Sequence, residues 1–595
     1  MKTARADAAA AHTPPVSNTL YYGDNLPLLR NPKLFPAESV DLVYLDPPFN
    51  SNADYNILFR EQGGEPAQGQ IKAFTDTWKW SELAFRDFTE YCPLPKLTAL
   101  VEGYVNTLGR NEMTAYLVMM APRLVELHRV LKNTGTLFLH CDPTASHYLK
   151  TLLDAVFGPT NFLNEIIWRR TGSHNSPRRF GPVHDVILFF AKGDGHFFKR
   201  LFRPYSAGHV KGYFRQEDEK GRYWTNALTG AGIRHGESGQ AWKGYDPTSK
   251  GRHWAIPGRV VEDLAINPKL GVLAKLDELD AAGVIDHPAN KEQMPTYRQY
   301  LHLSPGLPIQ DIWAYQPHTQ GTLATTDEGI DEDVRWLIAH GDAERLGYPT
   351  QKPAGLLRRI IESACPPKGV VLDPFCGCGT TIEAAHQFKR HWIGIDITHL
   401  AVALIKYRLS DSLRLKQGRH YRVVGEPATV AEAEALAQQN RFEFQKWALS
   451  LVPRAYPTAG GGADAGVDGL VRFNDDPRVA PKKCVIQVKS GAPKLGELRD
   501  FAHVIRREKA TLGLFILLAE PTAKMRQEAD TMGFYTTPLG GRKLPVFQIR
   551  TVAQLLAGEG FEIPESAVAL GVKRATDKST PAEQPDLLRE NGLEV

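Results

Sequence analysis

From residue 18 onward, apolar runs alternate with polar turns in the pattern of an α/β protein. The apolar runs have the length of buried strands or the spacing of amphipathic helices. The expected elements are a strand, turn and helix within 18–31, a buried strand at 41–45, a helix at 111–131, a strand at 135–142 and a helix at 145–158.

A second α/β segment follows a long irregular stretch. Between about residues 161 and 345 the chain is rich in Gly, Pro, Trp, Tyr and Arg, which predicts an inserted region with isolated strands. Beyond it we expect a helix at 353–365, a strand at 369–375, a helix at 380–388 and a strand at 391–397. One helix from about 431 to 452 then leads into a smaller α/β unit that ends near residue 564.

Composition bounds the class of protein. The chain has 595 residues, more than one hydrophobic core usually organises, so several domains are expected. No apolar stretch approaches the ~18 residues of a membrane helix and no signal-peptide core precedes residue 18, so we expect a cytoplasmic protein with no membrane partner. The six cysteines include no C-x-x-C pair. Residues 165–259 carry seventeen Lys or Arg against eight Asp or Glu, an excess suited to phosphate contact.

Two polar segments, residues 46–49 and 373–379, lie where predicted buried strands end, which is where α/β sheets carry their chemistry. In the first, Asp46 and the carbonyl of Pro47 can accept the two hydrogens of an amino group on a flat base, while Phe49 stacks on its ring. Pro47 and Pro48 stiffen this loop. An amino nitrogen on adenine or cytosine is a poor nucleophile because its lone pair is delocalised, and such acceptors relocalise the pair. The second segment, 373–379, has glycines that let backbone approach a nucleoside cofactor.

The first segment resembles the catalytic DPPF motif of amino DNA methyltransferases, and residues 373–381 resemble their glycine-rich S-adenosylmethionine motif. The catalytic motif precedes the cofactor motif by 327 residues, and this circularly permuted order resembles the β class of the family. Residues 348–353, 20–29 and 140–170 are also similar to family sequences. The resemblance covers most of residues 18–408 and implies a Rossmann-like, S-adenosylmethionine-dependent α/β fold.

The resemblance, together with the polar composition of the two ends, predicts an order of domains along the chain. The expected parts are a disordered lead at 1–17, a catalytic half at 18–165, a target-recognition insert at 166–345, a cofactor-binding half at 346–415, a restriction-endonuclease-like domain at 430–565 and a disordered tail at 566–595.

Cofactor contacts are expected from both halves of the methyltransferase. Gly377 and Gly379 would let the loop pass close to the methionine part of S-adenosylmethionine, because a Cβ there would crowd it. Asp396 closes the next predicted strand and is placed to accept hydrogen bonds from the ribose hydroxyls. The family resemblance adds as cofactor-side residues Asp24, Lys352, Asp373, Phe375 and Thr380.

The resemblance implies double-stranded DNA as the substrate, with the target nucleotide flipped out, because a base inside the duplex cannot reach such a site. In the insert, aromatic residues alternate with arginines, as they do in phosphate-binding and base-reading surfaces. By analogy, DPPF favours N6 of adenine over N4 of cytosine, which remains an alternative. The sequence shows no dedicated histidine base, so we expect the proton to pass to solvent. The sequence is compatible with a homodimer but does not determine the oligomeric state.

A second chemical centre is expected near the C-terminus. Residues 463–473 and 484–491 read as hairpin strands on which Gln487 and Lys489 share one face and Asp468 faces them. An acidic residue, a second oxygen ligand and a lysine suit a Mg²⁺ site that activates water against a phosphodiester. The pattern resembles the PD-(D/E)xK core of Mrr-like restriction enzymes in their glutamine-bearing form, and the resemblance implies Glu443 as the first acidic residue.

Several alternatives stay open on the sequence alone. Gln487 stands where a carboxylate is commonest, so the hairpin could also be an ordinary surface element or a module that only binds DNA. The whole chain could be a combined restriction and modification enzyme that cuts DNA lacking its own mark. It could also be a DNA-binding protein that senses cofactor or DNA without turnover, although the intact DPPF argues against this.

Overall fold

The computed structural model describes residues 18–48, 54–57, 71–75, 80–173, 178–290, 292–338, 342, 344–346, 348, 350–458, 466–476, 478–538 and 540–564. The chain divides into two compact units. The first comprises residues up to 199, 311–314 and 333 onward, and the second comprises 200–310 and 315–332. The predicted lead, the predicted tail and Phe49 lie outside the described residues.

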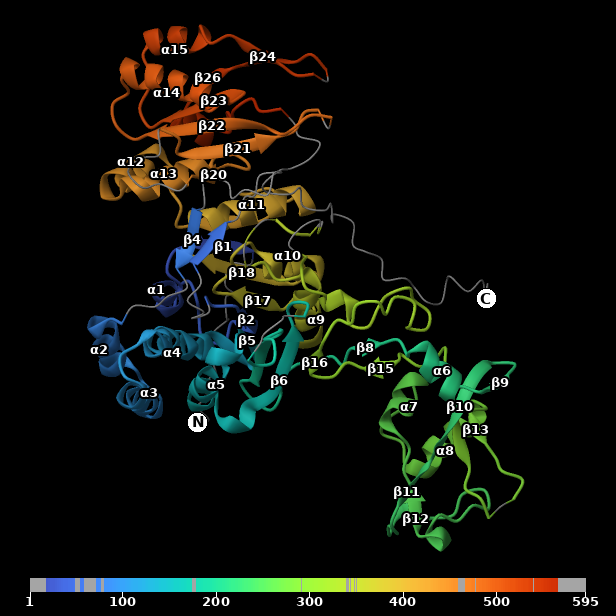
Figure 1. Ribbon diagram of the computed structural model, residues 1–595. Coiled ribbons are helices and arrows are strands. Elements are labelled where there is room, and N and C mark those ends of the chain that lie inside the picture. Colours follow the sequence, from blue (N-terminus) through green and yellow to red (C-terminus); the bar gives the residue numbers. More distant parts are fainter. Residues whose placement is uncertain are drawn as a thin grey trace, which may run out of the picture. The chain divides into compact units, whose positions relative to one another are not determined.

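The first unit contains a nine-stranded sheet with the order β16-β6-β7-β5-β2-β17-β18-β1-β19 (Figure 1). Its strands are β1 (Thr19–Tyr22), β2 (Val40–Leu45), β5 (Leu131–Cys141), β6 (Phe162–Arg169), β7 (His184–Ala191), β16 (Ile312–Trp313), β17 (Val370–Asp373), β18 (His391–Asp396) and β19 (Arg422–Val424). Strand β7 runs antiparallel to β5 and β6, and the other neighbouring strands run parallel. Strands β2 and β17 are therefore neighbours, and the two predicted loops leave the same edge of the sheet.

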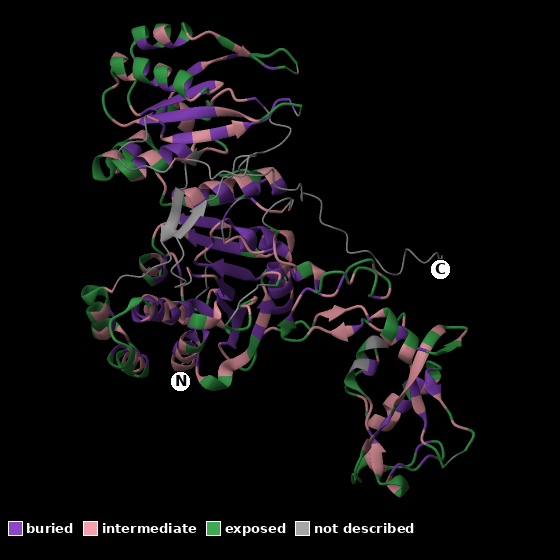
Figure 2. Cartoon of the chain, viewed as in Figure 1, coloured by how far each residue is buried: buried purple, intermediate pink, exposed green. Residues whose placement is uncertain are grey.

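Helices surround this sheet and bury its central strands (Figure 2). They are α1 (Asn25–Arg30), α2 (Glu82–Tyr91), α3 (Pro95–Leu108), α4 (Glu112–Val130), α5 (Pro143–Phe157), α9 (Ala354–Ala364), α10 (Thr380–Gln387) and α11 (His399–Leu413), and a separate pair of strands is formed by β3 (Asp54–Ile57) and β4 (Ile71–Thr75). Helix α4 begins where predicted, because the Asn111 and Thr114 side chains cap it reciprocally. Gly158 ends α5 at a positive φ of 88°.

The second unit is narrower than the predicted insert at 166–345. Strands β6, β7 and β16 fall inside that range but belong to the nine-stranded sheet, because β7 hydrogen-bonds β5 on one side and β6 on the other. Its strands and helices are β8 (Phe202–Arg203), α6 (Ala207–Tyr213), β9 (Gln216–Asp218), β10 (Gly221–Ala227), β11 (Thr229–Ala231), β12 (Arg252–Trp254), α7 (Gly258–Asp263), α8 (Val272–Ala281), β13 (Ile285–Asp286), β14 (Thr296–Tyr300) and β15 (Leu307–Pro308). Buried aromatics, including Trp242, Trp254 and Tyr245, form its core.

The C-terminal part of the first unit holds a five-stranded sheet in the order β20-β21-β22-β23-β26. Its elements are α12 (Val430–Gln439), α13 (Arg441–Ser450), β20 (Tyr456–Pro457), β21 (Gly469–Phe473), β22 (Lys482–Lys489), α14 (Leu495–Arg507), β23 (Leu512–Leu517), α15 (Ala523–Asp530), β24 (Phe534–Thr536), β25 (Lys543–Pro545), β26 (Phe547–Thr551) and α16 (Val552–Leu556). The predicted antiparallel pairing of β21 with β22 is confirmed.

The prediction of one helix over residues 431–452 is wrong, because the structure has two. Asn440 adopts extended backbone, and its side chain accepts hydrogen bonds from the amides of Phe442 and Glu443 at 3.0 and 3.2 Å. It therefore caps a new helix rather than continuing α12. No helix among the described residues is long and apolar enough to cross a membrane.

Candidate active site

A cavity of about 320 Å³ opens where β2, β17 and β18 end. Both predicted loops contribute to it, so segments far apart in the sequence share one site, as expected for the carboxyl edge of a parallel sheet. The predicted residues that line it are Asp24, Asp46, Pro47, Pro48, Lys352, Asp373, Phe375, Gly377, Thr380 and Asp396. Phe49 lies outside the described residues.

The carboxylate of Asp46 is held on one side only. Its Oδ2 lies 2.5 Å from Nζ of Lys352, and the side chains are 16% and 11% exposed. Its Oδ1 is buried and has no hydrogen-bond partner among the described residues. Lys352, expected from the family resemblance on the cofactor side, thus pairs with the predicted catalytic carboxylate. The sequence could not show this pairing, because 306 residues separate the two.

Asp396 lies at the end of β18 and is already an acceptor of several hydrogen bonds. The amide of Gly377 donates to its Oδ2 at 2.9 Å, and the amide and hydroxyl of Thr398 donate to its Oδ1 at 2.9 Å. Burial raises the pKa of Asp396 to about 6, although these hydrogen bonds oppose the shift. The hydrogen bonds fix the orientation of the carboxylate toward the cavity that it lines.

Asp373, at the end of β17, carries the largest carboxylate shift of the site. Burial raises its pKa to about 7, against hydrogen bonds from Thr381 and the Phe375 amide, and the charges of Asp46 and Asp396 raise it further. The carboxylates of Asp46, Asp373 and Asp396 thus repel one another across the same cavity, which consequently favours a cationic ligand.

Two further residues of this cavity were missed by the sequence reasoning. Arg123 of α4 donates to Oδ1 of Asp24 at 2.7 Å and to Oδ1 of Asn25 at 2.6 Å. Asn25 in turn donates to the carbonyl of Pro374 at 2.8 Å, which ties α1 to the cofactor loop. The predicted helix over 111–131 included Arg123, but helical spacing alone did not show that it faces this cavity.

The two glycines of the cofactor loop differ in the residue that an added Cβ would approach. Both have positive φ, 49° at Gly377 and 78° at Gly379. A Cβ at Gly377 would lie 3.2 Å from the Tyr348 ring, beside the cavity. A Cβ at Gly379 would lie 2.7 Å from Ile405 of α11, so the close approach at Gly379 is to a helix of the fold.

The C-terminal centre brings Asp468 and Gln487 together. Oδ2 of Asp468 accepts a hydrogen bond from the Val488 amide at 2.7 Å, and Nε2 of Gln487 donates to the Gly466 carbonyl at 3.1 Å. Oε1 of Gln487 is buried without a hydrogen-bond partner in the described part of the chain. Lys489 contacts Glu497 at 3.5 Å. Among the described residues, no group of three or more His, Cys, Asp or Glu side chains is placed to hold a metal ion.

Glu443, the remaining residue predicted for the nuclease site, pairs with a lysine of its own helix. It lies on α13 and accepts a hydrogen bond from Lys446 at 2.8 Å, one turn along the same helix. The sequence prediction that Glu443 belongs to the metal site therefore stays a prediction.

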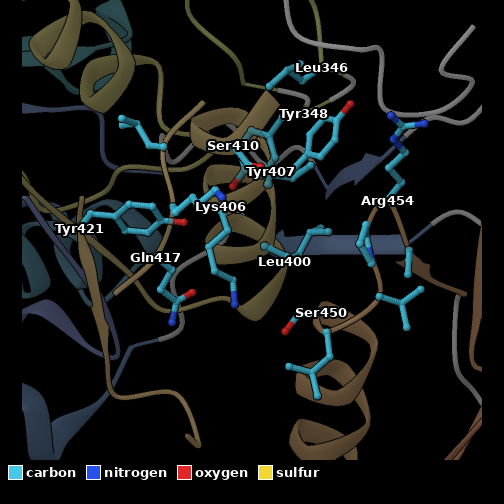
Figure 3. A pocket seen from close by; sticks show the side chains of 18 residues that line it. Leu346, Tyr348, Leu400, Lys406, Tyr407, Ser410, Gln417, Tyr421, Ser450 and Arg454 are labelled. Atoms are coloured by element: carbon cyan, nitrogen blue, oxygen red, sulfur yellow. The ribbon is translucent and has the colours of Figure 1, made fainter. Parts of the chain in front are cut away.

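A second cavity of about 400 Å³ lies against α11 and the turn at residues 450–455 (Figure 3). Figure 3 shows Tyr407, Tyr421 and Lys406 among the side chains around it. Tyr348 lines both cavities. None of the residues predicted for catalysis lines the larger cavity, so size alone does not identify the active site.

Known protein families match both parts of the chain that contain these candidate sites. A DNA methylase family model matches residues 40–407, and a restriction endonuclease model of the Mrr type matches residues 436–535. The type II methyltransferase M.EcaI of Enterobacter cloacae is 30% identical over 299 residues, which cover 50% of this chain and 58% of that protein. The Mod subunit of the type III restriction-modification enzyme StyLTI of Salmonella typhimurium is 27% identical over 381 residues, or 62% and 49%. The chain spans about half the length of these curated relatives.

Among solved structures, the cytosine-N4-specific PvuII DNA methyltransferase is 14% identical, with a TM-score of 0.29 over 65% of this chain and 85% of that one. The M1.HpyAVI complex with S-adenosylmethionine is 12% identical, also with a TM-score of 0.29, over 66% and 98%. These scores are too low to assign a fold, so the assignment depends on the sequence match over residues 40–407. On that match the chain belongs to the DNA methylase family, and a restriction-endonuclease domain of the Mrr type follows its methylase domain.

Proposed function

We propose that this protein transfers a methyl group from S-adenosylmethionine to the N6 amino group of adenine in double-stranded DNA. One observation carries the proposal: Oδ1 of Asp46 is buried at the cavity without a hydrogen-bond partner in the described residues, while Oδ2 is held by Lys352. A buried acceptor left unpaired costs about 1–3 kcal/mol, so such an oxygen is best explained by a ligand that donates to it. An exocyclic amino group is such a donor.

The loop can activate that amino group as well as hold it. Asp46 Oδ1 accepts one amino hydrogen, and the carbonyl of Pro47, the next cavity residue, accepts the other. Two acceptors in this arrangement favour a more tetrahedral nitrogen, whose lone pair is then available for attack. Lys352 keeps Asp46 fixed, so little rotational freedom is lost when the base binds.

The cofactor side of the cavity fits S-adenosylmethionine. Asp396 is fixed as an acceptor suited to ribose hydroxyls, and Gly377 leaves room beside it. Burial, and then the charges of Asp46 and Asp396, raise the pKa of Asp373, and a positively charged ligand would offset these negative charges. When bound, S-adenosylmethionine supplies an electrophilic methyl group on a cationic sulfur.

The DNA would enter at the same sheet edge. Strand β7 runs antiparallel to β5, so the residues that precede it lie near the end of β2 that carries Asp46. There Arg178, Arg179 and Phe180 are exposed, Phe180 completely. The second unit, by contrast, carries fifteen Lys or Arg and sixteen Asp or Glu, so the predicted basic excess does not extend over that unit as a whole. Phosphate contact is therefore proposed for Arg178 and Arg179.

The test is methyl transfer from labelled S-adenosylmethionine to unmethylated double-stranded DNA, followed by digestion to nucleosides. We expect label in N6-methyladenine, and loss of transfer with retained cofactor binding in Asp46→Asn. Asp87→Asn, an exposed position on α2, serves as the matched control. Label in N4-methylcytosine would replace adenine with cytosine as the substrate. No label in either base with the parent protein would refute the methyltransferase proposal and leave a DNA-binding protein.

A second activity is proposed for the C-terminal domain, namely Mg²⁺-dependent cleavage of DNA that lacks the methyl mark. The observation that favours it is the buried, unpartnered Oε1 of Gln487 beside Asp468, because both oxygens are of a kind that Mg²⁺ prefers. Asp468 and Gln487 would hold the ion, and Lys489 would face the phosphate.

Cleavage is tested by adding Mg²⁺ to unmethylated plasmid and comparing Asp468→Ala with Asp500→Ala, an exposed position on α14. We expect the parent and Asp500→Ala to cut and Asp468→Ala not to cut. Equal cutting by all three proteins would place the metal site elsewhere, and no cutting by the parent would leave a module that only binds DNA.

A further inference from the structure

Three buried polar side chains lie on three adjacent strands of the methyltransferase sheet, next to the active-site cavity. Tyr44 of β2 lines the cavity, and its hydroxyl lies 3.0 Å from Nδ1 of His140 on β5. Nε2 of His140 lies 3.1 Å from Oδ2 of Asp185 on β7. All three residues are at most 2% exposed. Oδ1 of Asp185 then lies 3.0 Å from Nε of Arg170, whose side chain is 46% exposed.

The chemistry of Asp185 and Tyr44, the two outer members of this series, determines the direction of its hydrogen bonds. Burial would raise the pKa of Asp185, but its hydrogen bond with His140, together with the charges of Lys352 and Arg170, holds it below its usual value. Asp185 is therefore an anion that only accepts, and Nε2 of His140 must carry the hydrogen. Nδ1 of a neutral His140 is then an acceptor, and the Tyr44 hydroxyl donates to it.

The Tyr44 hydroxyl keeps its proton, and its oxygen has lone pairs that can accept a further hydrogen bond. Burial, and then the charges of Asp46, Asp373 and Asp185, raise the pKa of Tyr44 well above its usual value, so the hydroxyl stays protonated. An uncharged phenol that donates inward can still accept a hydrogen bond at the cavity it lines. The arrangement has the order of hydroxyl, imidazole and carboxylate found in hydrolytic triads.

We propose that Tyr44, His140 and Asp185 form a proton relay that takes the proton released from the methylated amino nitrogen. The inference rests on the proposed methyl transfer and names where its proton goes. As the nitrogen–methyl bond forms and the sulfur–methyl bond breaks, with its electron pair remaining on sulfur, the nitrogen becomes cationic. One of its two protons leaves its hydrogen bond with the Pro47 carbonyl and passes to the Tyr44 oxygen, while the Tyr44 proton passes to Nδ1 of His140. The resulting imidazolium is paired with the Asp185 carboxylate, and the proton returns to solvent after the product leaves.

The surroundings of His140 define its acid–base environment. The charged or titratable groups that interact with His140 or with its two partners are Tyr44 on β2, Asp46 and Asp373 at the ends of β2 and β17, Asp185 on β7, Arg170 after β6, and Lys352. Trp168 packs edge-on against the His140 ring with centroids 5.5 Å apart. The relay requires Nδ1 of His140 to be free of a hydrogen, because a hydrogen on Nδ1 would leave no acceptor for Tyr44 and would slow transfer.

The test measures single-turnover methyl transfer at saturating S-adenosylmethionine and DNA between pH 5.5 and 9 (roughly the range in which histidine titrates), in parent, Tyr44→Phe, His140→Gln and Asp185→Asn. We expect Tyr44→Phe to slow transfer about 100-fold and to lose both the acid-side slope and the solvent deuterium isotope effect, with unchanged binding of cofactor. His140→Gln should lose the same slope. Tyr21→Phe, which removes a hydroxyl from a buried tyrosine of β1, is the control.

Each outcome decides the inference. Tyr44→Phe that transfers as fast as the parent, or keeps the parent's pH slope and isotope effect, overturns the relay. Slow Tyr44→Phe beside parent-like His140→Gln and Asp185→Asn overturns it too, because the phenol would then act alone. Asp185→Asn keeps the shape and one acceptor oxygen for His140 but removes the charge, so it tests the charge even if another variant fails to fold. A parent that transfers no methyl group refutes the proposed function itself, and the relay with it; the relay alone fails only when the parent is active.

Discussion

The pair between Lys352 and Asp46 predicts a specific penalty when its cation is removed. Lys352→Met keeps most of the side-chain volume but leaves the Asp46 carboxylate in a largely buried position without its counter-ion. Removing one partner of a buried ion pair costs about 3–5 kcal/mol, because the remaining charge is uncompensated. The side chains are 11% and 16% exposed, so we expect a value near the lower end, about 3 kcal/mol.

The fold supplies a matched pair for comparison. Lys199 contacts Glu362 at 2.7 Å, but the side chains are 56% and 26% exposed. Pairs of this kind contribute about 0–1 kcal/mol, so Lys199→Met should have little effect on stability. The two substitutions are chemically identical and differ chiefly in the burial of the ion pair.

Hydrogen exchange in increasing urea, read out on peptides that contain β2 and β17, measures the unfolding free energy of this sheet separately from the C-terminal domain. We expect Lys352→Met to lower that free energy by about 3 kcal/mol and Asp46→Asn/Lys352→Met to lower it by about 2 kcal/mol less than the sum of the single variants. Additive effects, or equal losses in Lys352→Met and Lys199→Met, would refute the reasoning that this pair is a desolvated ionic contact.

Three further predictions follow from other contacts. Gly379→Ala should lower the thermal midpoint and weaken cofactor binding, because the positive φ of 78° and the 2.7 Å approach to Ile405 both oppose a Cβ; an unchanged midpoint in calorimetry would contradict this. Asp373 has a native pKa of about 7, raised above its usual value by burial, so its stabilising contribution is present at pH 4 and lost as pH rises through 7. The midpoint of Asp373→Asn relative to the parent should therefore rise between about pH 4 and 7 and level off above, and a flat difference would argue against it. Asn440→Ala should cost about 1 kcal/mol through the lost cap of α13, with Gln439→Ala as the control.

The strands and the general place of the site could be predicted from the sequence. Apolar runs marked β2 and β17 as buried, and the rule that sheet chemistry lies at carboxyl ends placed Asp46 and Asp373 at one edge. The partners across that edge could not be predicted. Which strand lies beside β5, and in what register, determines that His140 meets Asp185, and no local pattern encodes this register.

Two errors of the sequence reading have identifiable causes. Residues 166–191 lie among Gly- and Arg-rich segments and were assigned to the insert, but hydrogen bonding of β7 to β5 and of β6 to β7 makes their strands part of the main sheet. The apolar spacing of the predicted helix continues across Asn440, so periodicity did not reveal the break. There a single capping side chain overrides the continuous pattern.

The position of β1 in the sheet has a consequence for how the protein is made. Strand β1 pairs with β18 and β19, so it leaves the ribosome long before its hydrogen-bonding partners in residues 391–424 are made. The edge of β2 that receives β17 also stays unpaired until about residue 370 has been synthesised. Sheet closure in the methyltransferase must therefore be a late, long-range event, and the nascent N-terminal half would present unpaired strand edges to chaperones during translation.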